Sequence, residues 1–316
     1  MENSLSILQC VFPACLSLTT VAFNAVAILA LRRTLALPKN FKLLLLSMAV
    51  SDVGVSLLVQ PLYVAITVMF KEKSPDQSIN QSTTYLTTLT STNTSARSKY
   101  ELDTYLVILK GAYFFATNFI CAASLIGVTA LAADRFLAIH LHLRYHEFVT
   151  YNRVVFVVIL IWMSSAVIGL LFLWDLSVGF ASVPVTTIVC LVVITLFYLK
   201  IYLAVKYHTE QIAAMQAFDG GEINKEKQRN AEKQKKAAIT IFCVYLVLVV
   251  CYLPNLILTC IRLADEKFTT AKSLLFFNDL LIFLNSSLNP LIYCWKMKHI
   301  QHAVRNILVN IFSCLS

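Results

Sequence analysis

Charged residues are scarce in this sequence. Only 14% of its 316 residues are Asp, Glu, Lys or Arg, whereas 58% are apolar, and the mean hydropathy is +0.73. An average soluble domain is about a quarter charged and about 45–50% apolar. An ordinary soluble fold is therefore excluded, and we expect the chain to lie in a membrane.

Glycine is also rare, with seven residues, and no segment of the chain repeats another. Transporters built from internal repeats and from helices broken at glycine or proline are therefore disfavoured, although a transporter is kept as a minor alternative. Motifs of nucleic-acid binding are absent too, so no nucleic-acid partner is expected. The formal net charge of +9 then reflects the Lys and Arg excess of cytosolic loops.

The nine cysteines do not follow the pattern of a secreted disulfide framework. Most of them lie inside apolar runs, where cysteine is usually a small buried hydrophobe. A cleavable signal peptide is not expected either, because Arg32 and Arg33 follow the first apolar run in place of a small-residue cleavage site.

Long apolar runs dominate the rest of the sequence. Only helices and closed barrels satisfy their backbone groups in lipid, and these runs lack the alternation of barrel strands. About 20 apolar residues cross a hydrocarbon core. We predict an all-α membrane protein, one domain over residues 1–316, with seven spanning helices. The predicted spans are residues 9–31, 43–70, 104–136, 154–174, 181–205, 237–261 and 273–295.

The lysines and arginines between the spans predict the orientation. Segments on the side where the first span ends hold 17 of them, and segments on the other side hold 7. Because cytosolic loops carry the Lys and Arg excess, the N-terminus is predicted to be extracellular. The protein as a whole is expected in the plasma membrane. Glycosylation sequons at Asn80 and Asn93 agree, since both fall in the first outer loop. That loop, residues 71–103, is rich in Ser and Thr and is expected to be flexible.

Two cytosolic segments also have a predicted structure. The charged third inner loop, up to residue 236, is expected to continue its neighbouring helices into the cytosol. Apolar residues recur at helical spacing over residues 297–312, which predicts an amphipathic helix on the inner membrane surface. Cys314, near the end of this helix, is a candidate for palmitoylation.

Acidic residues inside the predicted spans are candidates for function, because a charge in the membrane interior costs about 2.5–3.5 kcal/mol or more. Asp52 and Asp279 lie within spans, and Asp134 lies at the inner end of the third span. Residues 279, 283, 286, 290 and 293 follow helical spacing, so they are predicted to form one stripe on the seventh span.

Three short motifs complete the pattern. The third span closes on Asp134-Arg135-Phe136, the sixth holds Cys251-Tyr252-Leu253-Pro254, and the seventh holds Asn289-Pro290-Leu291-Ile292-Tyr293. With Asn24, Asp52 and Trp162 in the first, second and fourth spans, they resemble the signatures of rhodopsin-class G-protein-coupled receptors. The resemblance covers all seven spans in order, with phenylalanine and tyrosine at positions 136 and 252 in place of the family's tyrosine and tryptophan.

The resemblance implies a switch that couples an extracellular ligand to a heterotrimeric G protein. In the family, Asp134 holds Arg135 at rest, and activation pivots the sixth span at Pro254 to open a cavity for a G-protein helix. The implied coupling residues are Asp134, Arg135, Phe136, Tyr198, Tyr252, Pro254, Asn289, Pro290 and Tyr293. Arrestin is a further candidate partner, and enzyme activity is not expected.

The resemblance also implies a sodium site in the middle of the membrane. The residues that it assigns to this site are Asp52, Ser124, Asn285, Ser286 and Asn289. No other cofactor is expected.

The positions at which the chain departs from the family's usual residues indicate which branch of the family it resembles. Lys110 stands where members usually have the cysteine of a disulfide, the second outer loop from Asp175 to about Phe180 has no cysteine, and Cys190 replaces a common proline. These losses, and the stretch of residues 143–150, resemble the melanocortin receptors; adenosine, cannabinoid and lysophospholipid receptors share parts of the pattern. No disulfide is expected between the third span and this loop, and Cys10 with Cys260 is a candidate pair.

The ligand does not carry over from any of these groups. Thr117 replaces the amine-binding aspartate, Phe283 the lysine of opsins, and Thr259 the asparagine of adenosine receptors. The acidic cluster of melanocortin receptors is not matched either, because Leu62, Lys110 and Phe114 occupy its positions. The predicted pocket consists of Lys110, Tyr113, Thr117, Tyr252, Asn255, Thr259, Asp279 and Phe283.

Asp279 has two readings that the sequence leaves open. As the charged anchor of the ligand site it would bind a small cation or the basic group of a peptide. Alternatively, it forms an internal ion pair with Lys110 or is a water-exposed acid at the helix end. At the level of the whole chain, a seven-helix decoy or dimerisation partner that does not signal is the other alternative, because Phe136 and Tyr252 alter the switch.

Overall fold

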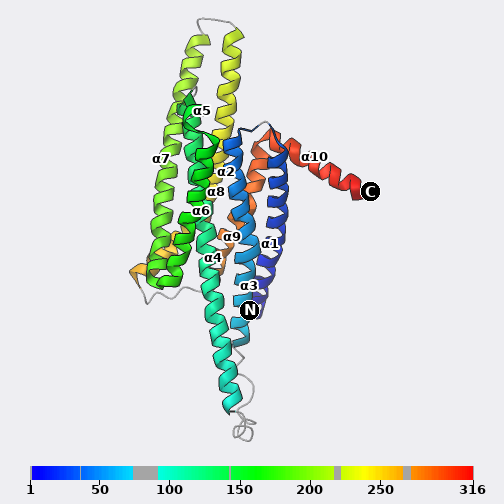
Figure 1. The fold of residues 1–316 in the computed structure, drawn as a ribbon, viewed down its shortest axis with the longest axis vertical. Coiled ribbons are helices and arrows are strands. Elements are labelled where there is room, and N and C mark those ends of the chain that lie inside the picture. The colour runs from blue at the N-terminus through cyan, green and yellow to red at the C-terminus, as the bar shows by residue number, and fades with distance from the viewer. Residues whose placement is uncertain are drawn as a thin grey trace.

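The structure, a computed structural model, describes residues 2–35, 37–73, 92–141, 144–216, 222–265 and 272–315. Within these ranges every regular element is a helix, and the helices run side by side in an elongated bundle (Figure 1). The elements are α1 (Glu2–Arg33), α2 (Lys39–Gly54), η1 (Val55–Val59), α3 (Gln60–Lys73), α4 (Thr92–His140), α5 (Tyr145–Phe148), α6 (Tyr151–Trp174), α7 (Leu176–Gln216), α8 (Glu222–Ala264), α9 (Lys272–Lys296) and α10 (Lys298–Leu315).

The described residues contain seven helical segments long and apolar enough to cross a membrane. This confirms the predicted all-α fold with seven spans. The segments are Leu8–Arg33, Lys39–Met69, Asp103–His140, Tyr151–Trp174, Leu176–Ala204, Phe242–Ala264 and Leu274–Trp295.

The helices extend further than their apolar runs. α7 continues to Gln216 and α8 starts at Glu222, so both leave the bundle at one end, as predicted (Figure 1). α10 runs sideways from that end, in agreement with the predicted surface helix, and begins one residue later than predicted.

The first outer loop was predicted to be flexible over residues 71–103, and this is wrong for residues 71–73, which end α3, and from Thr92 onward. α4 begins at Thr92, because Ala, Arg, Lys and Glu in the segment are good helix formers that extend the helix outside the apolar run. Asn80 and the rest of residues 74–91 lie outside the described residues. Asn93 belongs to the first turn of α4, but its side chain is outside the described part.

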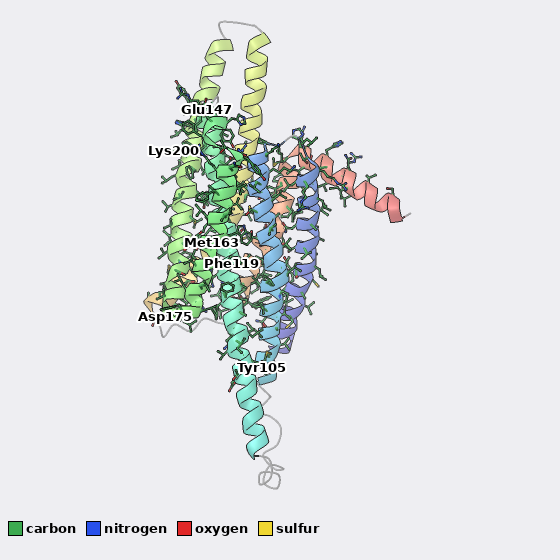
Figure 2. All side chains as sticks on the ribbon, viewed as in Figure 1. Tyr105, Phe119, Glu147, Met163, Asp175 and Lys200 are labelled. Carbon is green, nitrogen blue, oxygen red and sulfur yellow. The ribbon has the colours of Figure 1, made fainter. Side chains whose placement is uncertain are left out.

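The second outer loop is shorter than predicted, because only Asp175 separates α6 from α7 (Figure 2). Its Oδ1 accepts hydrogen bonds from the backbone N–H groups of Ser177 (2.7 Å) and Val178 (3.3 Å), so Asp175 caps the start of α7. Hydrogen bonds from Ser177 and Val178 also lower the pKa of this carboxyl. Gly179 completes the turn, since a Cβ there would lie 2.7 Å from Cγ of Phe172.

The second span contains a wider turn that the sequence analysis did not predict. At η1 the N–H of Gln60 donates to Val55 O, five residues back, as in a π-helix. Pro61 explains the distortion, because it has no N–H and its ring clashes with the carbonyl one turn earlier. The Ser56 carbonyl instead accepts a hydrogen bond of 2.7 Å from Ser17 Oγ of α1.

Candidate functional site

An ion pair lies near the C-terminal end of α4. The carboxylate of Asp134 accepts a 3.0 Å hydrogen bond from Nε of Arg135 and also bonds its Nη2. The second carboxylate oxygen accepts a hydrogen bond of 2.6 Å from the Tyr145 hydroxyl. Only 4% of Asp134 and 12% of Arg135 are exposed, so the pair is sealed from solvent. Tyr145 was not predicted, because it belongs to α5, outside the sequence motif.

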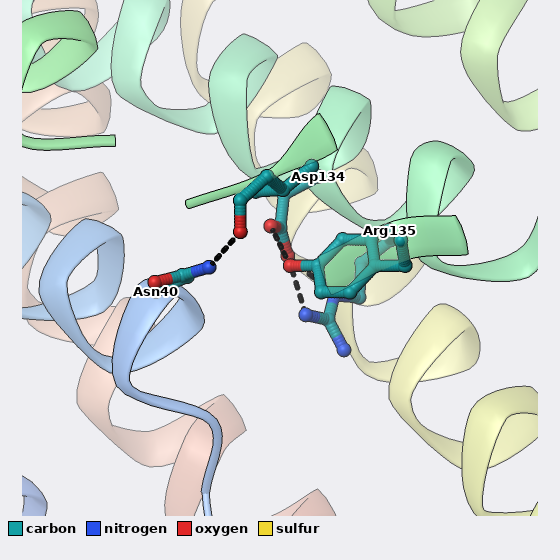
Figure 3. Close-up of polar contacts among 5 residues, drawn as sticks. Asn40, Asp134 and Arg135 are labelled. Carbon is teal, nitrogen blue, oxygen red and sulfur yellow. Dashed lines mark hydrogen bonds and ion pairs between the residues drawn. The ribbon is translucent and has the colours of Figure 1, made fainter. Parts of the chain in front are cut away.

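The surrounding residues connect this pair to α2. The guanidinium carbon of Arg135 lies 4.0 Å from the centre of the Phe41 ring, a cation–π contact. Asn40 lies close by and donates to the Val149 carbonyl at 2.6 Å, which ties the loop after α5 to α2 (Figure 3). Burial and the adjacent Asp134 charge raise the pKa of the Tyr145 phenol, so it stays a neutral donor.

Phe136, the third residue of the motif, contacts aromatic residues and not the ion pair. Its ring stacks on His140 at 5.3 Å and contacts Phe197 of α7 at 5.6 Å between centroids. The phenylalanine at the family's tyrosine position therefore packs between α4 and α7 and takes no part in the ion pair.

The residues of the predicted sodium site come together in the bundle interior. Asp52, Ser124, Asn285, Ser286 and Asn289 are all fully buried. Asn289 Nδ2 donates to Asp52 Oδ2 at 2.9 Å. Several side-chain oxygens of the cluster have no hydrogen-bond partner among the described residues: Asp52 Oδ1, Ser124 Oγ, Asn285 Oδ1 and Asn289 Oδ1.

This oxygen-rich set suits a hard cation, because carboxylate, hydroxyl and amide oxygens are its preferred ligands and Asp52 supplies the compensating charge. Asn24 anchors the cluster to α1, since it donates to the carbonyls of Thr20 (3.0 Å) and Ser286 (3.1 Å). The Thr20 and Ser287 hydroxyls lie 2.5 Å apart and add a second contact between α1 and α9.

The two tyrosines assigned to the opened cavity are buried here. The Tyr293 hydroxyl donates to the sulfur of Met48 at 3.0 Å. Tyr198 packs its ring against Phe242 and Tyr245 of α8, with centroids 5.4 and 5.3 Å away. Both side chains therefore contact neighbouring helices near the end of the bundle that holds Arg135.

A small cavity lies between the helices, in the half of the bundle nearer to the turn at Asp175. Its volume is about 50 Å³, room for a few waters at about 10–15 Å³ each. Three predicted pocket residues, Thr117, Tyr252 and Asn255, line it, and the hydroxyl of Thr117 is buried without a hydrogen bond. The other lining residues, which were not predicted, are Asn118, Cys121, Ala122, Leu125, Ile168, Val183, Thr186, Thr187 and Ile282.

The remaining predicted pocket residues lie beside the cavity. Phe283 is a core residue, packed edge-on against Tyr63 at 5.5 Å, and Tyr63 also contacts Tyr113 at 6.2 Å. Thr259 donates to the Asn255 carbonyl at 2.8 Å. Lys110 lies on α4, one turn outward of Phe114.

Asp279 is partly buried on α9, on the same side of the helix as the buried residues Phe283, Ser286 and Tyr293. Arg262, near the end of α8, is a cation close enough to attract its carboxylate. Beside it, Asn278 donates to Asn255 Oδ1 at 3.2 Å and so connects α9 with the cavity wall. Neither Arg262 nor Asn278 was singled out in the sequence, because their roles depend on how α8 packs on α9.

The described cysteines are free. Cys10 and Cys260, the candidate pair, are both unbonded, as are the cysteines of the spans. The side chain of Cys314 lies outside the described part of the chain.

The chain matches the sequence model of the 7 transmembrane receptor (rhodopsin family) over residues 109–179 and 172–293. These matches extend across more than half of the chain, so it belongs to this family of seven-helix membrane receptors.

Its relatives fall in the expected branches. The adenosine receptor A3 of Ovis aries is 25% identical over 217 residues, 61% of this chain and 65% of that protein. Melanocortin receptor 3 of Homo sapiens is 29% identical over 203 residues, 59% of this chain and 57% of that protein. The adenosine receptor A2b of Gallus gallus is 23% identical over 343 aligned positions, 98% of this chain and 90% of that protein.

These matches confirm the expected place near the adenosine and melanocortin receptors. The chain spans less than two thirds of the length of the first two relatives. All three relatives are named as receptors, which fits the expectation that the chain is not an enzyme.

Proposed function

We propose that this chain is a G-protein-coupled receptor, captured in its resting arrangement. The observation that carries the proposal is the sealed ion pair of Asp134 and Arg135, held by Tyr145 and covered by Phe41. A largely buried ion pair contributes little net stability, because desolvation offsets the attraction, so it suits a contact that opens in a second state. Release on outward movement of α8 would expose Arg135 to a G-protein helix.

The orientation follows from charge. The end of the bundle at which α7 and α8 protrude carries the Lys and Arg excess, and the N-terminus lies toward the other end (Figure 1). We therefore place the N-terminus outside and the Arg135 end in the cytosol of the plasma membrane. Glycosylation at Asn80 and Asn93 and palmitoylation of Cys314 remain proposals that agree with this placement.

The proposed mechanism connects the ligand cavity with Arg135 through the buried polar residues of the bundle. An outer ligand would shift α8 at Pro254, next to the cavity-lining residue Tyr252. The cluster around Asp52 would hold sodium at rest, and the bound ion would balance the carboxylate charge. Tyr198 and Tyr293 would leave their partners and line the opened inner cavity with Arg135. The same opened cavity would receive arrestin.

The ligand site is proposed to combine the cavity with Asp279. The lining of Thr117, Tyr252 and Asn255 is uncharged and supplies hydrogen bonds. Asp279 would supply the charge for a small cation or the basic group of a peptide, with Arg262 as its partner in the absence of ligand.

The deciding experiment measures G-protein recruitment in cells, with each G-protein class in turn, with and without screened ligands. Arg135→Ala should abolish coupling at matched surface expression, whereas Arg33→Ala, which removes an exposed cation at the same end, should leave it intact. Equal coupling by both variants would reduce Arg135 to one more cytosolic charge. No recruitment by the unmodified chain under any condition would favour the decoy reading.

A further inference from the structure

A groove faces the membrane between α4 and α6, away from the ligand cavity and the ion pair. Its volume is about 510 Å³. Both helices cross the membrane at this level. Figure 2 marks its position by Met163, which is 62% exposed part-way along the bundle. The lining residues are Ile126, Thr129, Ala130 and Ala133 of α4 and Val157, Leu160, Ile161, Met163 and Ser164 of α6.

The groove is hollow because small side chains, Ala130, Ala133 and Ser164, take up positions where larger ones would fill the space between the helices. Its hydroxyls are already bonded within their own helices. Thr129 Oγ1 donates to Leu125 O at 3.0 Å, and Ser164 Oγ donates to Ile161 O at 3.1 Å. An occupant therefore meets an apolar surface, which suits a hydrocarbon chain and disfavours a polar group.

Two basic side chains, Arg153 and Lys200, lie at one end of the groove. Arg153 is exposed one helical turn before Val157, so it continues the groove face of α6, and its Nη1 donates to Phe148 O at 2.8 Å. On α4, Phe136 continues the face of Ala133, and the Nζ of Lys200 lies 5.6 Å from its ring centre. Figure 2 shows Lys200 and the acidic Glu147 toward the same end of the bundle.

The distance from Arg153 to the far end of the groove matches the thickness of one leaflet. The helix from Arg153 to Ser164 rises about 16 Å at 1.5 Å per residue. Half of a hydrocarbon core of about 30 Å is about 15 Å. A chain that starts at the cations would thus end at the middle of the membrane, where the groove ends.

We propose that the groove binds one acyl chain of an anionic phospholipid, whose net negative headgroup lies against Arg153 and Lys200. The lipid belongs to the leaflet at the Arg153 end, the inner leaflet in the orientation proposed above. A sterol offers no anion to these two cations. A second copy of the chain, docked through the same face around a two-fold axis, would bring its own Arg153 and Lys200 against them.

The test uses the full chain in lipid discs of phosphatidylcholine with a trace of phosphatidylserine whose acyl chain carries a photoreactive group. After illumination, labelled peptides are mapped by mass spectrometry. Labels should concentrate on the groove residues of α4 and α6. The double variant Ala130→Leu with Ser164→Leu fills the groove and should remove them, whereas Ala25→Leu, on the exposed face of α1, should not.

The headgroup contact is tested by a variant that leaves the groove intact. Arg153→Gln should reduce groove labelling by about fivefold, the effect of one lost attraction between arginine and an anionic lipid. A photoreactive phosphatidylcholine should label the groove of the unmodified chain about as weakly. Equal labelling of the α1 face, displacement of the label by sterol, or crosslinks between two copies through the groove would each overturn the proposal.

Discussion

At the scale of single residues, the proposed resting state depends on how the Asp134 carboxylate is hydrogen-bonded. Arg135 occupies one oxygen and Tyr145 the other. The sequence motif predicts the contact between Arg135 and Asp134. It does not predict the contact from Tyr145, because that residue reaches Asp134 only when α5 packs against the end of α4. Local motifs could therefore identify the charged pair, while its enclosure depends on packing between segments.

Tyr145→Phe should raise basal activity. The change removes a hydrogen bond to a buried carboxylate, worth about 1.5–3 kcal/mol, from the resting state. The resting-to-active equilibrium shifts by the same amount, and basal G-protein recruitment at matched surface expression should rise. Tyr151→Phe removes a hydroxyl from an exposed tyrosine nearby and is the control. Equal basal signals from the two variants would mean that Tyr145 does not stabilise the closed pair.

Asp52→Asn should abolish the response of the protein to sodium. The unmodified protein should melt at a higher temperature in sodium chloride than in choline chloride, because an ion bound only by the folded state stabilises it. The variant removes the one carboxylate of the cluster and should melt equally in both salts. A sodium effect that survives the substitution would place the ion elsewhere.

Asp279→Asn should weaken a cationic agonist by about 1–3 orders of magnitude, in line with about 2–5 kcal/mol for truncating one member of a buried charge pair. Basal coupling should stay unchanged. The competing reading is an internal pair with Lys110. If the exchange of Lys110→Asp with Asp279→Lys restores what each single change damages, the anchor role is refuted.

At the scale of elements, aromatic packing joins α4, α6 and α7 near the turn at Asp175. Phe114 of α4 stacks on Phe172 of α6 at 5.7 Å with planes 7° apart. Phe180 of α7 meets both rings edge-on, at 5.7 and 5.3 Å. Gly179 allows the close approach, so three helices are joined at the outer end without cysteine.

Phe172→Ala should therefore destabilise the protein by about 3–5 kcal/mol, the usual cost of truncating a buried phenylalanine. Loss of this ring would also loosen the outer ends of α4 and α7. Thermal unfolding in detergent provides the measurement. Trp174→Ala, on the same helix but 89% exposed, is the matched control and should change stability by less than about 0.5 kcal/mol. A similar loss in both variants would contradict a specific role of the aromatic contact.

The apolar runs predicted the membrane spans, but they did not predict where each helix begins and ends outside the membrane. The spans could be predicted because a run of about 20 apolar residues is long enough to cross the hydrocarbon core and too apolar to be exposed to water. The extensions of α4 to Thr92 and of α7 to Leu176 were not, because outside lipid the end of a helix depends on capping and local propensity. The cavity lining was predicted only in part, since it depends on the rotation of each helix.

At the scale of the whole molecule, the bundle is expected to stay intact under reducing conditions. The described cysteines are unbonded, and most are partly or fully buried in the spans. Reduction should therefore leave the melting temperature unchanged, and mass mapping of blocked thiols should find no crosslink between α4 and the turn at Asp175. A crosslinked peptide pair from that region would refute the prediction.

The wide turn at η1 changes how this receptor is compared with others. A π turn contains one residue more than an α turn, so every side chain outward of Val59 is rotated by about 100° relative to an uninterrupted helix. Tyr63 meets Phe283 through this rotation. Relatives whose second span lacks the turn must be aligned with a one-residue gap after Val59. Chimeras that exchange the outer part of this span without that gap would present the neighbouring side chain to the bundle and bury the wrong face.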